Sequence, residues 1–363
     1  MYKLIRFDKE ENYIKDFLVI PKKLYSTGDI VQNEKEEREL LLEKHVLSKY
    51  FKIYKLIVYN NGSACARCVV TVYPGDDYSC IGFFESINDV ECSKLLFEEA
   101  SRISKSNKCN KIKGPIDCSF WIKYRLKLNN FEGKSYVSEP YNKEYYLELF
   151  LAGGYKIVET YVSNYYKKPP MFNYINKKSK ERYEKFTSEG YQIISPKEKD
   201  YDIVIREIYK LLMELYKDFP VFKSLSEEDF LEHFGSYRHI LDFSFVKMAY
   251  YNEEAVGFVI GMPDYGNMLY GKLGLIKYAK LFLKKIRSSN YVLLYMGVEP
   301  EHYGLGNAMS QTIITNIQKK RATSIGSLIK EGKVTQRYVN NKIVLSNTYA
   351  LLEYEIADSV TSR

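Results

Sequence analysis

The segment from Tyr291 to Lys320 constrains the fold more than any other part of the sequence. An apolar run, Tyr291 to Val298, is followed by a polar loop with a proline, then by Gly304 and Gly306, and then by a helical pattern. This order predicts a strand, a glycine-containing turn and the start of a helix. The first backbone N–H groups of a helix have no partner inside it and point outward at its positive end, and glycine lets a bulky anion approach. The segment therefore predicts a site for a phosphorylated cofactor in the second half of the chain.

The size and charge of the chain restrict its class. Its 363 residues are enough for two domains that each bury a core, and its hydrophobic share of 45% is ordinary for a globular protein. The formal net charge of +8 suits an anionic ligand, and the dispersed lysines do not favour nucleic acid. The first residues, MYKLIRFDKEENY, are too acidic for a signal peptide, and no run of about eighteen apolar residues is present. We therefore expect a cytoplasmic protein with no membrane partner.

Six cysteines lie between Cys65 and Cys118. Cys65 and Cys68 form a CxxC pair, but the surrounding run ACARCVVTVY is typical of a strand, in which residues three apart face opposite sides. A single CxxC without a second pair is a weak indication of zinc. We expect buried free thiols and no metal site.

The two halves of the chain follow the same order of elements: strand, helices, hairpin strands, strand, helix, strand, helix, strand. In the first half we expect strands at 2–7, 51–59, 64–73, 80–84, 111–113 and 156–166, and helices at 36–48, 89–104 and 145–151. In the second half we expect strands at 191–194, 245–250, 255–262, 291–298, 324–330 and 349–356, and helices at 203–216, after the capping box Ser224-x-x-Glu227, and at 276–287, 305–320 and 334–342. The order predicts two copies of one α/β lobe, residues 1–166 and 191–363, joined by a polar crossover at 167–190.

This lobe order, with an anion site between the fourth strand and the following helix, resembles the GNAT superfamily of acyl-CoA N-acyltransferases. The phosphate motif of that family, Gln/Arg-x-x-Gly-x-Gly/Ala, falls on Tyr303-x-x-Gly306-x-Ala308, with Gly304 as the usual extra glycine. Tyr303 departs from the motif, but that position normally offers its backbone N–H. The resemblance implies an α/β fold of two GNAT-like lobes, each a mixed, mostly antiparallel central sheet flanked by helices.

A closer similarity covers nearly the whole chain. The runs that carry it include Gly82-Phe83-Phe84-Glu85, Lys113-Gly114-Pro115, Pro140-Tyr141-Asn142 and Met296-Gly297-Val298-Glu299-Pro300. They resemble one group of tandem GNAT-like proteins of this length, whose substrates are mostly undefined. The loop of the first lobe that matches the phosphate loop, Glu85 to Cys92, has no glycine and three acidic residues. We therefore expect that only the second lobe binds a cofactor.

The resemblance implies a set of site residues in the second lobe. Acetyl-CoA, or a longer acyl-CoA, is expected to place its pyrophosphate on the N–H groups of Tyr303, Gly304, Leu305, Gly306, Asn307 and Ala308. Aminolysis of the thioester needs a base for the amine, a donor for the oxyanion and an acid for the thiolate. Glu331 is the first candidate for the base and Glu299 the second. The N–H of Val298 is the candidate oxyanion donor, and Tyr338 is the candidate acid.

The expected function is transfer of an acyl group from CoA to the amine of a small molecule or amino acid. Three alternatives remain open from the sequence. Two are transferases of the same fold, one that uses aminoacyl-tRNA and one that uses acyl carrier protein as the donor. The third is a non-catalytic module that binds acyl-CoA or a partner. The sequence identifies neither the acceptor, nor the acyl length, nor the oligomeric state.

Overall fold

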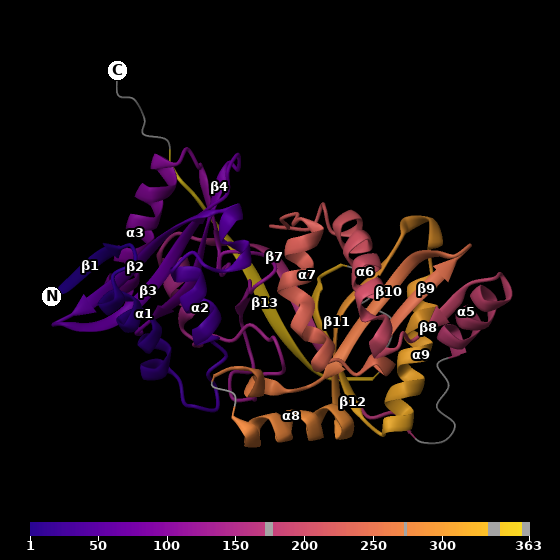
Figure 1. Ribbon diagram of the computed structural model, residues 1–363. Coiled ribbons are helices and arrows are strands. Elements are labelled where there is room, and N and C mark those ends of the chain that lie inside the picture. Colours follow the sequence, from indigo (N-terminus) through magenta and orange to yellow (C-terminus); the bar gives the residue numbers. More distant parts are fainter. Residues whose placement is uncertain (171–176, 272–273, 333–341, 358–363) are drawn as a thin grey trace. The chain divides into compact units, whose positions relative to one another are not determined.

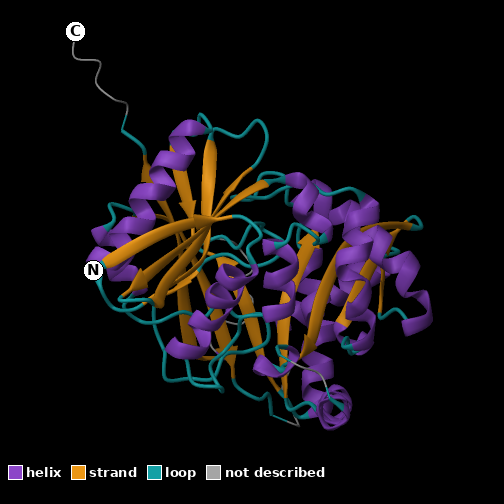
Figure 2. Ribbon diagram, turned by 60° about the vertical axis from the view of Figure 1, so that its left-hand side comes forward, coloured by secondary structure: helices purple, strands orange, loops and turns teal. Residues whose placement is uncertain are grey.

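The computed structural model describes residues 1–170, 177–271, 274–332 and 342–357. The chain divides into two compact units. Unit 1 comprises Met1–Tyr161, Leu269–Lys272 and Asn347–Arg363, and unit 2 comprises Val162–Met268 and Leu273–Ser346. The expected α/β fold, with a mixed and mostly antiparallel sheet flanked by helices in each lobe, is confirmed (Figures 1 and 2).

Unit 1 is built on a sheet whose described strand pairs are antiparallel, except for the parallel pair of β4 and β5. Its strand order is β1 (Tyr2–Phe7), β2 (Lys52–Asn60), β3 (Ser63–Val72), β4 (Tyr78–Ser86), β5 (Lys111–Gly114) and β13 (Ile343–Glu355), and β6 (Leu126–Lys127) also pairs with β13. Its helices are α1 (Glu11–Leu24), α2 (Glu34–Leu41), a 3-10 helix (Val46–Tyr50), α3 (Val90–Ser106) and α4 (Tyr146–Ala152).

The core of unit 1 lies between the sheet and α3. Leu96, Ala100 and Ile103 recur at helical spacing on α3 and are buried against the strands. Phe97, on the same helix, stacks on Phe84 of β4 with ring centroids 5.3 Å apart. This packing fixes the end of β4 against the middle of α3.

Unit 2 repeats the arrangement. Its strands follow the order β7 (Lys156–Tyr166), β12 (Thr323–Lys330), β11 (Asn290–Val298), β10 (Glu254–Pro263), β9 (Val246–Tyr251) and β8 (Gln192–Ile194), and the β11–β12 pair is parallel. Its helices are α5 (Lys177–Ser188), α6 (Tyr201–Leu215), α7 (Glu227–Phe234), α8 (Leu275–Arg287) and α9 (Leu305–Lys320). Short 3-10 helices lie at Glu198–Asp200, Gly235–His239, Phe243–Phe245, Gly266–Leu269 and Pro300–His302.

The core of unit 2 lies between α9 and the sheet. Leu305, Met309 and Ile313 face the strands at helical spacing and are buried. Tyr291, the second residue of β11, stacks on Phe245 with ring centroids 3.7 Å apart. Both the strand and the helix that bracket the expected phosphate loop are therefore anchored in one core.

The units differ from the expected lobes at two strands. β7 and β13 each have residues in both units, because the division falls after Tyr161 and after Ser346. Residues 347–357 group with unit 1, whereas we expected the whole of 191–363 to form the second lobe. The physical reason is pairing: Leu352 to Glu355 of β13 lie antiparallel to β5. A sequence pattern indicates a strand but not the sheet that it joins.

Two helices were not expected from the sequence. α1 contains Pro21, and α5 falls in the segment that we interpreted as a polar crossover. α5 buries only Ser179 and Phe186, which is too little apolar surface to give a helical periodicity. The expected helix at 334–342 falls almost wholly outside the described residues.

Candidate functional site

The expected phosphate loop joins β11 to α9. β11 ends at Val298, a 3-10 turn spans Pro300–His302, and Gly304 is the N-cap of α9. Gly304 has a φ of 97°, in the left-handed region that glycine adopts without strain. No side chain caps this helix. The N–H groups of Asn307 and Ala308 donate to the Gly304 carbonyl at 3.1 and 3.4 Å, so of the expected donors in α9 only those of Leu305 and Gly306 have no acceptor among the described residues, at the helix end that carries positive partial charge.

Arg182 of α5 lies at this helix end, and the sequence did not identify it. Its Nη1 atom is 3.0 Å from the position that a Cβ would take at Gly304. Within the described parts of the chain, no ion pair or hydrogen bond is recorded for the Arg182 guanidinium. A cation at the positive end of a helix is unfavourable by itself, but an anion between them interacts well with both. An anion bound between the loop and Arg182 would contact both, and we call this place the anion cradle.

The strands next to the loop diverge. The parallel ladder between β11 and β12 runs from Asn290–Thr323 to Leu293–Gly326 and ends there, although β11 continues to Val298. On its other side, β11 stays paired with β10 as far as Val298. The last residues of β11 therefore have one edge that β12 does not occupy.

Val298 turns its backbone N–H toward this free edge. The N–H of Glu299 donates to the carbonyl of Val256 at 3.0 Å, so these two residues form a hydrogen-bonded pair of the antiparallel ladder. Such pairs alternate along the ladder, and Val298, which faces Gly257, is in a pair without hydrogen bonds. Its N–H consequently points away from β10. This orientation is what an oxyanion donor in the gap requires.

Two of the three predicted catalytic residues, Glu299 and Glu331, directly follow these strands. Glu299 follows β11, and its Oε2 is 3.8 Å from Nε2 of His302, whose Nδ1 is 2.7 Å from the Tyr191 hydroxyl. Glu331 lies exposed in the turn after β12. Tyr338 is outside the described residues. The structure thus brings Glu299 and His302 together beside the loop. The roles of Glu331 as a base and of Tyr338 as the acid stay predictions.

The matching loop of unit 1 is built differently. Asp89 is the N-cap of α3, and its carboxylate accepts hydrogen bonds from the N–H of Cys92 (3.0 Å) and from the Tyr2 hydroxyl (2.6 Å). The Tyr2 hydrogen bond, followed by that from Cys92, lowers the pKa of Asp89. The Asp89 carboxylate therefore caps α3, whereas the N-cap of the matching helix α9 is Gly304, which has no side chain.

The gap between β4 and β5 is also closed. Their ladder ends at Cys80–Lys113, and beyond it the N–H of Ile116 donates to the Ile81 carbonyl at 2.8 Å. Asp117 accepts a hydrogen bond from the N–H of Phe83 at 2.5 Å. A Cβ at Gly82 would lie 1.9 Å from the Ile116 carbonyl oxygen. Backbone thus fills the position that is free beside β11.

A polar cavity of about 50 Å³ remains inside unit 1, next to the end of β4. Arg67 lines it, is fully buried, and pairs with Glu37 at 2.7 Å. Glu85, also buried, accepts hydrogen bonds from Tyr25 (2.8 Å), Gln32 (2.7 Å) and Tyr146 (2.7 Å). Burial raises the pKa of Glu85 to about 7, against the opposing effect of Arg67. The sequence placed Glu85 in a loop, whereas it is a buried residue of β4.

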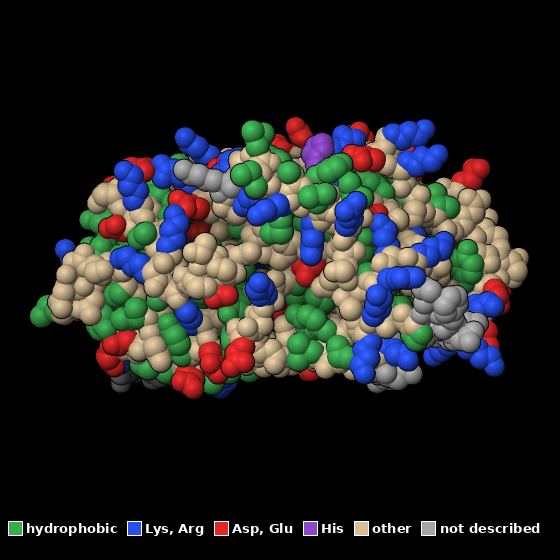
Figure 3. Space-filling view, turned by 90° about the horizontal axis from the view of Figure 1, so that it is seen from below, with side chains coloured by type: hydrophobic (Ala, Val, Ile, Leu, Met, Phe, Trp, Pro, Cys, Tyr) green, Lys and Arg blue, Asp and Glu red, His purple; other side chains and the backbone are tan. Residues whose placement is uncertain are grey.

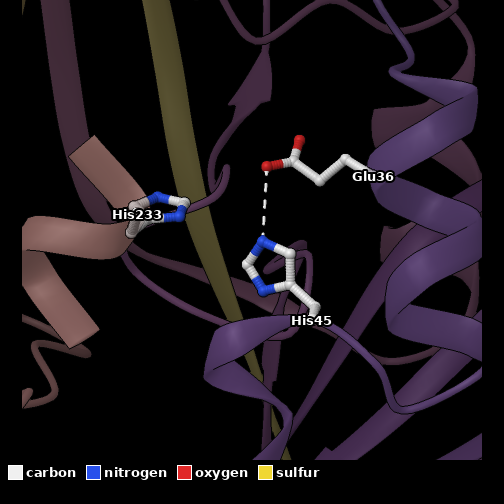
Figure 4. Close-up of side chains that lie close together, drawn as sticks. All are labelled: Glu36, His45 and His233. Atoms are coloured by element: carbon white, nitrogen blue, oxygen red, sulfur yellow. Dashed lines mark ion pairs between the residues drawn. The ribbon is translucent and has the colours of Figure 1, made fainter. Parts of the chain in front are cut away.

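Possible metal-binding groups were sought among the described residues of each unit. Glu36 and His45 of unit 1 form an ion pair of 3.8 Å (Figure 4). Taking the described residues of each unit separately, no three His, Cys, Asp or Glu side chains come close enough to share an ion. All six cysteines are buried free thiols, as expected.

Comparison with known proteins identifies the fold. No family model and no characterised protein sequence matches the chain. Among solved structures, it is similar to a tandem GNAT protein from the clavulanic acid biosynthesis pathway, with 8% identity, a TM-score of 0.56 and coverage of 99% of this chain and 100% of that one. It is also similar to a GCN5-related N-acetyltransferase from Sphaerobacter thermophilus, with 11% identity, a TM-score of 0.51 and coverage of 99% and 97%. A GCN5-related N-acetyltransferase from Anabaena variabilis gives 8% identity, a TM-score of 0.51 and coverage of 98% and 73%. The chain therefore has a tandem GNAT-like fold, as expected.

Proposed function

We propose that the chain is an acyl-CoA-dependent N-acyltransferase that acts on the amine of a small molecule or amino acid. The observation that carries the proposal is the start of α9, where no N-cap side chain is present at Gly304 and the Arg182 guanidinium lies close by. A CoA pyrophosphate has the charge and shape for this cradle. The similar solved structures are consistent with it, because they include proteins titled N-acetyltransferases.

The free edge of β11 suits the pantetheine arm and the thioester. An extended amide chain would pair with the Val298 N–H there as an added strand does, and would displace the Tyr216 hydroxyl from the Met296 carbonyl, to which it donates at 3.3 Å. The N–H of Val298 is placed to donate to the thioester oxygen as negative charge develops there. Attack of the amine nitrogen on the thioester carbon forms the C–N bond and breaks the C–S bond.

Two protons must move in this reaction. Glu299 or Glu331 accepts a proton from the amine, directly or through water, and Glu299 has the adjoining His302 and Tyr191 to pass that proton to solvent. The departing thiolate takes a proton from Tyr338. Unit 1 is proposed to bind no CoA, because Asp89 caps α3 and the segment at Ile116 fills the gap beside β4.

Binding of CoA tests the donor site. We expect acetyl-CoA and CoA to raise the thermal stability of the full chain, by about 2.7 kcal/mol at a hundredfold excess over the dissociation constant. Arg182→Gln should weaken binding by roughly tenfold to a hundredfold, because one charge-assisted hydrogen bond is lost. Gly306→Glu should abolish it by placing a carboxylate at the pyrophosphate. Lys178→Gln, an exposed residue of the same helix, is the matched control.

The remaining alternatives are separated by further arms of the same assay. If aminoacyl-tRNA or an acyl carrier protein stabilises the chain and CoA does not, that molecule is the donor in place of acyl-CoA. If CoA binds but no thiol is released with any of a panel of amines, the chain is an acyl-CoA-binding module. If Arg182→Gln and Gly306→Glu bind CoA as the unsubstituted chain does, the assigned cradle is wrong.

A further inference from the structure

Helix α8 of unit 2 presents most of its apolar side chains to solvent. The structure describes every residue of this helix, and Leu281 alone is buried. Leu275 is 90% exposed and Phe282 is 63% exposed. The other exposed large apolar residues are Ile276, Tyr278, Leu283 and Ile286. A helix that packed only on its own domain would turn these side chains inward.

These side chains lie on one face. With about 3.6 residues per turn, the exposed apolar residues occupy a single arc of about 160° around the helix axis, from Tyr278 through Phe282 and Ile286 to Ile276. Leu281 lies outside that arc, on the side packed against unit 2. Exposed apolar surface that is contiguous in this way marks an interaction site.

The rest of the helix is basic. α8 contains five basic residues and no acidic one: Lys277, Lys280, Lys284, Lys285 and Arg287. Lys285 is turned toward the protein, where it donates to the His239 carbonyl (3.1 Å) and pairs with Glu198 (3.7 Å). No described acidic side chain pairs with Lys280, Lys284 or Arg287. Seen from below, hydrophobic side chains lie beside Lys and Arg side chains on the face that carries α8 (Figure 3).

We propose that α8 binds the surface of an anionic lipid bilayer. Its apolar arc would enter the boundary between headgroups and acyl chains, and its lysines would contact lipid phosphates, as in interfacial amphipathic helices. No described helix is long and apolar enough to cross a membrane, and surface binding needs none. The sequence expectation of no membrane partner rested on the absence of a signal peptide and a spanning segment, and not on binding to a membrane surface. This proposal is independent of the acyl-transfer proposal.

Vesicle sedimentation with the full chain tests the proposal. We expect the chain to sediment with vesicles that contain phosphatidylglycerol and to stay in solution with vesicles of phosphatidylcholine alone. Replacing the pair Phe282→Ser and Ile286→Ser keeps every charge and should lower the partition coefficient by at least about a hundredfold. Replacing the pair Lys280→Gln and Lys284→Gln should lower it by about 25-fold, at about fivefold for each lysine.

A matched control comes from α6 in the same unit. Ile203 is 65% exposed and Lys210 is exposed, so the pair Ile203→Ser and Lys210→Gln removes similar groups from another helix and should leave sedimentation unchanged. Circular dichroism verifies that all variants fold. Absence of sedimentation with anionic vesicles overturns the proposal, as does equal sedimentation of the Phe282 and Ile286 variant. A dimer in gel filtration that this variant disperses would assign α8 to a second copy of the chain instead.

Discussion

Glu85 should make the stability of unit 1 depend on pH. Burial raises the pKa of this carboxyl from 4.5 to about 7 in the folded chain. In the unfolded chain the group returns to its ordinary value, so between these two values the folded state holds the proton more tightly. The free energy of unfolding therefore falls as the pH rises through this window and levels off above it. A shift of this size corresponds to about 3 kcal/mol, at about 1.4 kcal/mol for each pKa unit.

The effect is measured by urea unfolding at several pH values between about 5 and about 8. Trp121 is the single tryptophan, is buried in unit 1 and reports that unit by fluorescence. Glu36 and Asp117 also have pKa values raised by burial, so the unsubstituted chain carries their contributions as well. The difference between the unsubstituted chain and Glu85→Gln isolates Glu85. Glu98→Gln, on an exposed part of α3, is the control.

The expected result is a shallower pH profile for Glu85→Gln than for the unsubstituted chain. The neutral carboxamide removes the cost of a buried charge above the folded-state pKa. If the two profiles are parallel across the window, Glu85 does not titrate there, and the hydrogen bonds from Tyr25, Gln32 and Tyr146 hold its charged form as well as water does.

Two further predictions concern the closed loop of unit 1. Gly82→Ala should destabilise unit 1 by at least about 3 kcal/mol, because the added Cβ meets the Ile116 carbonyl oxygen at 1.9 Å. Gly28→Ala is the control, because the nearest atom to its added Cβ is 3.8 Å away, and it should leave the stability unchanged. Equal urea midpoints for the two variants would contradict the described packing. Asp89→Ala should cost about 1 kcal/mol through loss of the α3 cap, measured by Trp121 fluorescence in urea, and an unchanged midpoint would show that the cap contributes nothing.

The sequence was a good guide to the fold where its patterns are local. The run from Tyr291, the glycines and the helix after them predicted β11, its turn and α9, because strand, turn and helix each depend on neighbouring residues. The hairpin of the strands expected at 51–59 and 64–73 was predicted for the same reason. The partner of β13 was not, since pairing with β5 depends on contacts far apart in the chain.

The candidate site shows the same limit. The phosphate loop was recognised from its spacing, but Arg182 lies on a helix whose polar sequence gave no periodicity. The cavity around Arg67 and Glu85 was also missed, because each is a single charged residue in a strand-like run. Only the three-dimensional packing shows that these two side chains are buried and face each other, 3.9 Å apart.

The placement of β13 has a consequence for synthesis of the chain. Lys111 of β5 contacts Glu353 of β13, 242 positions later. While the nascent chain emerges from the ribosome, the edge of β5 that pairs with β13 stays unpaired until the residues up to Glu353 have been synthesised. An unpaired strand edge recruits other strands, so the interval before β13 emerges is the one in which β5 is exposed to pairing with other chains.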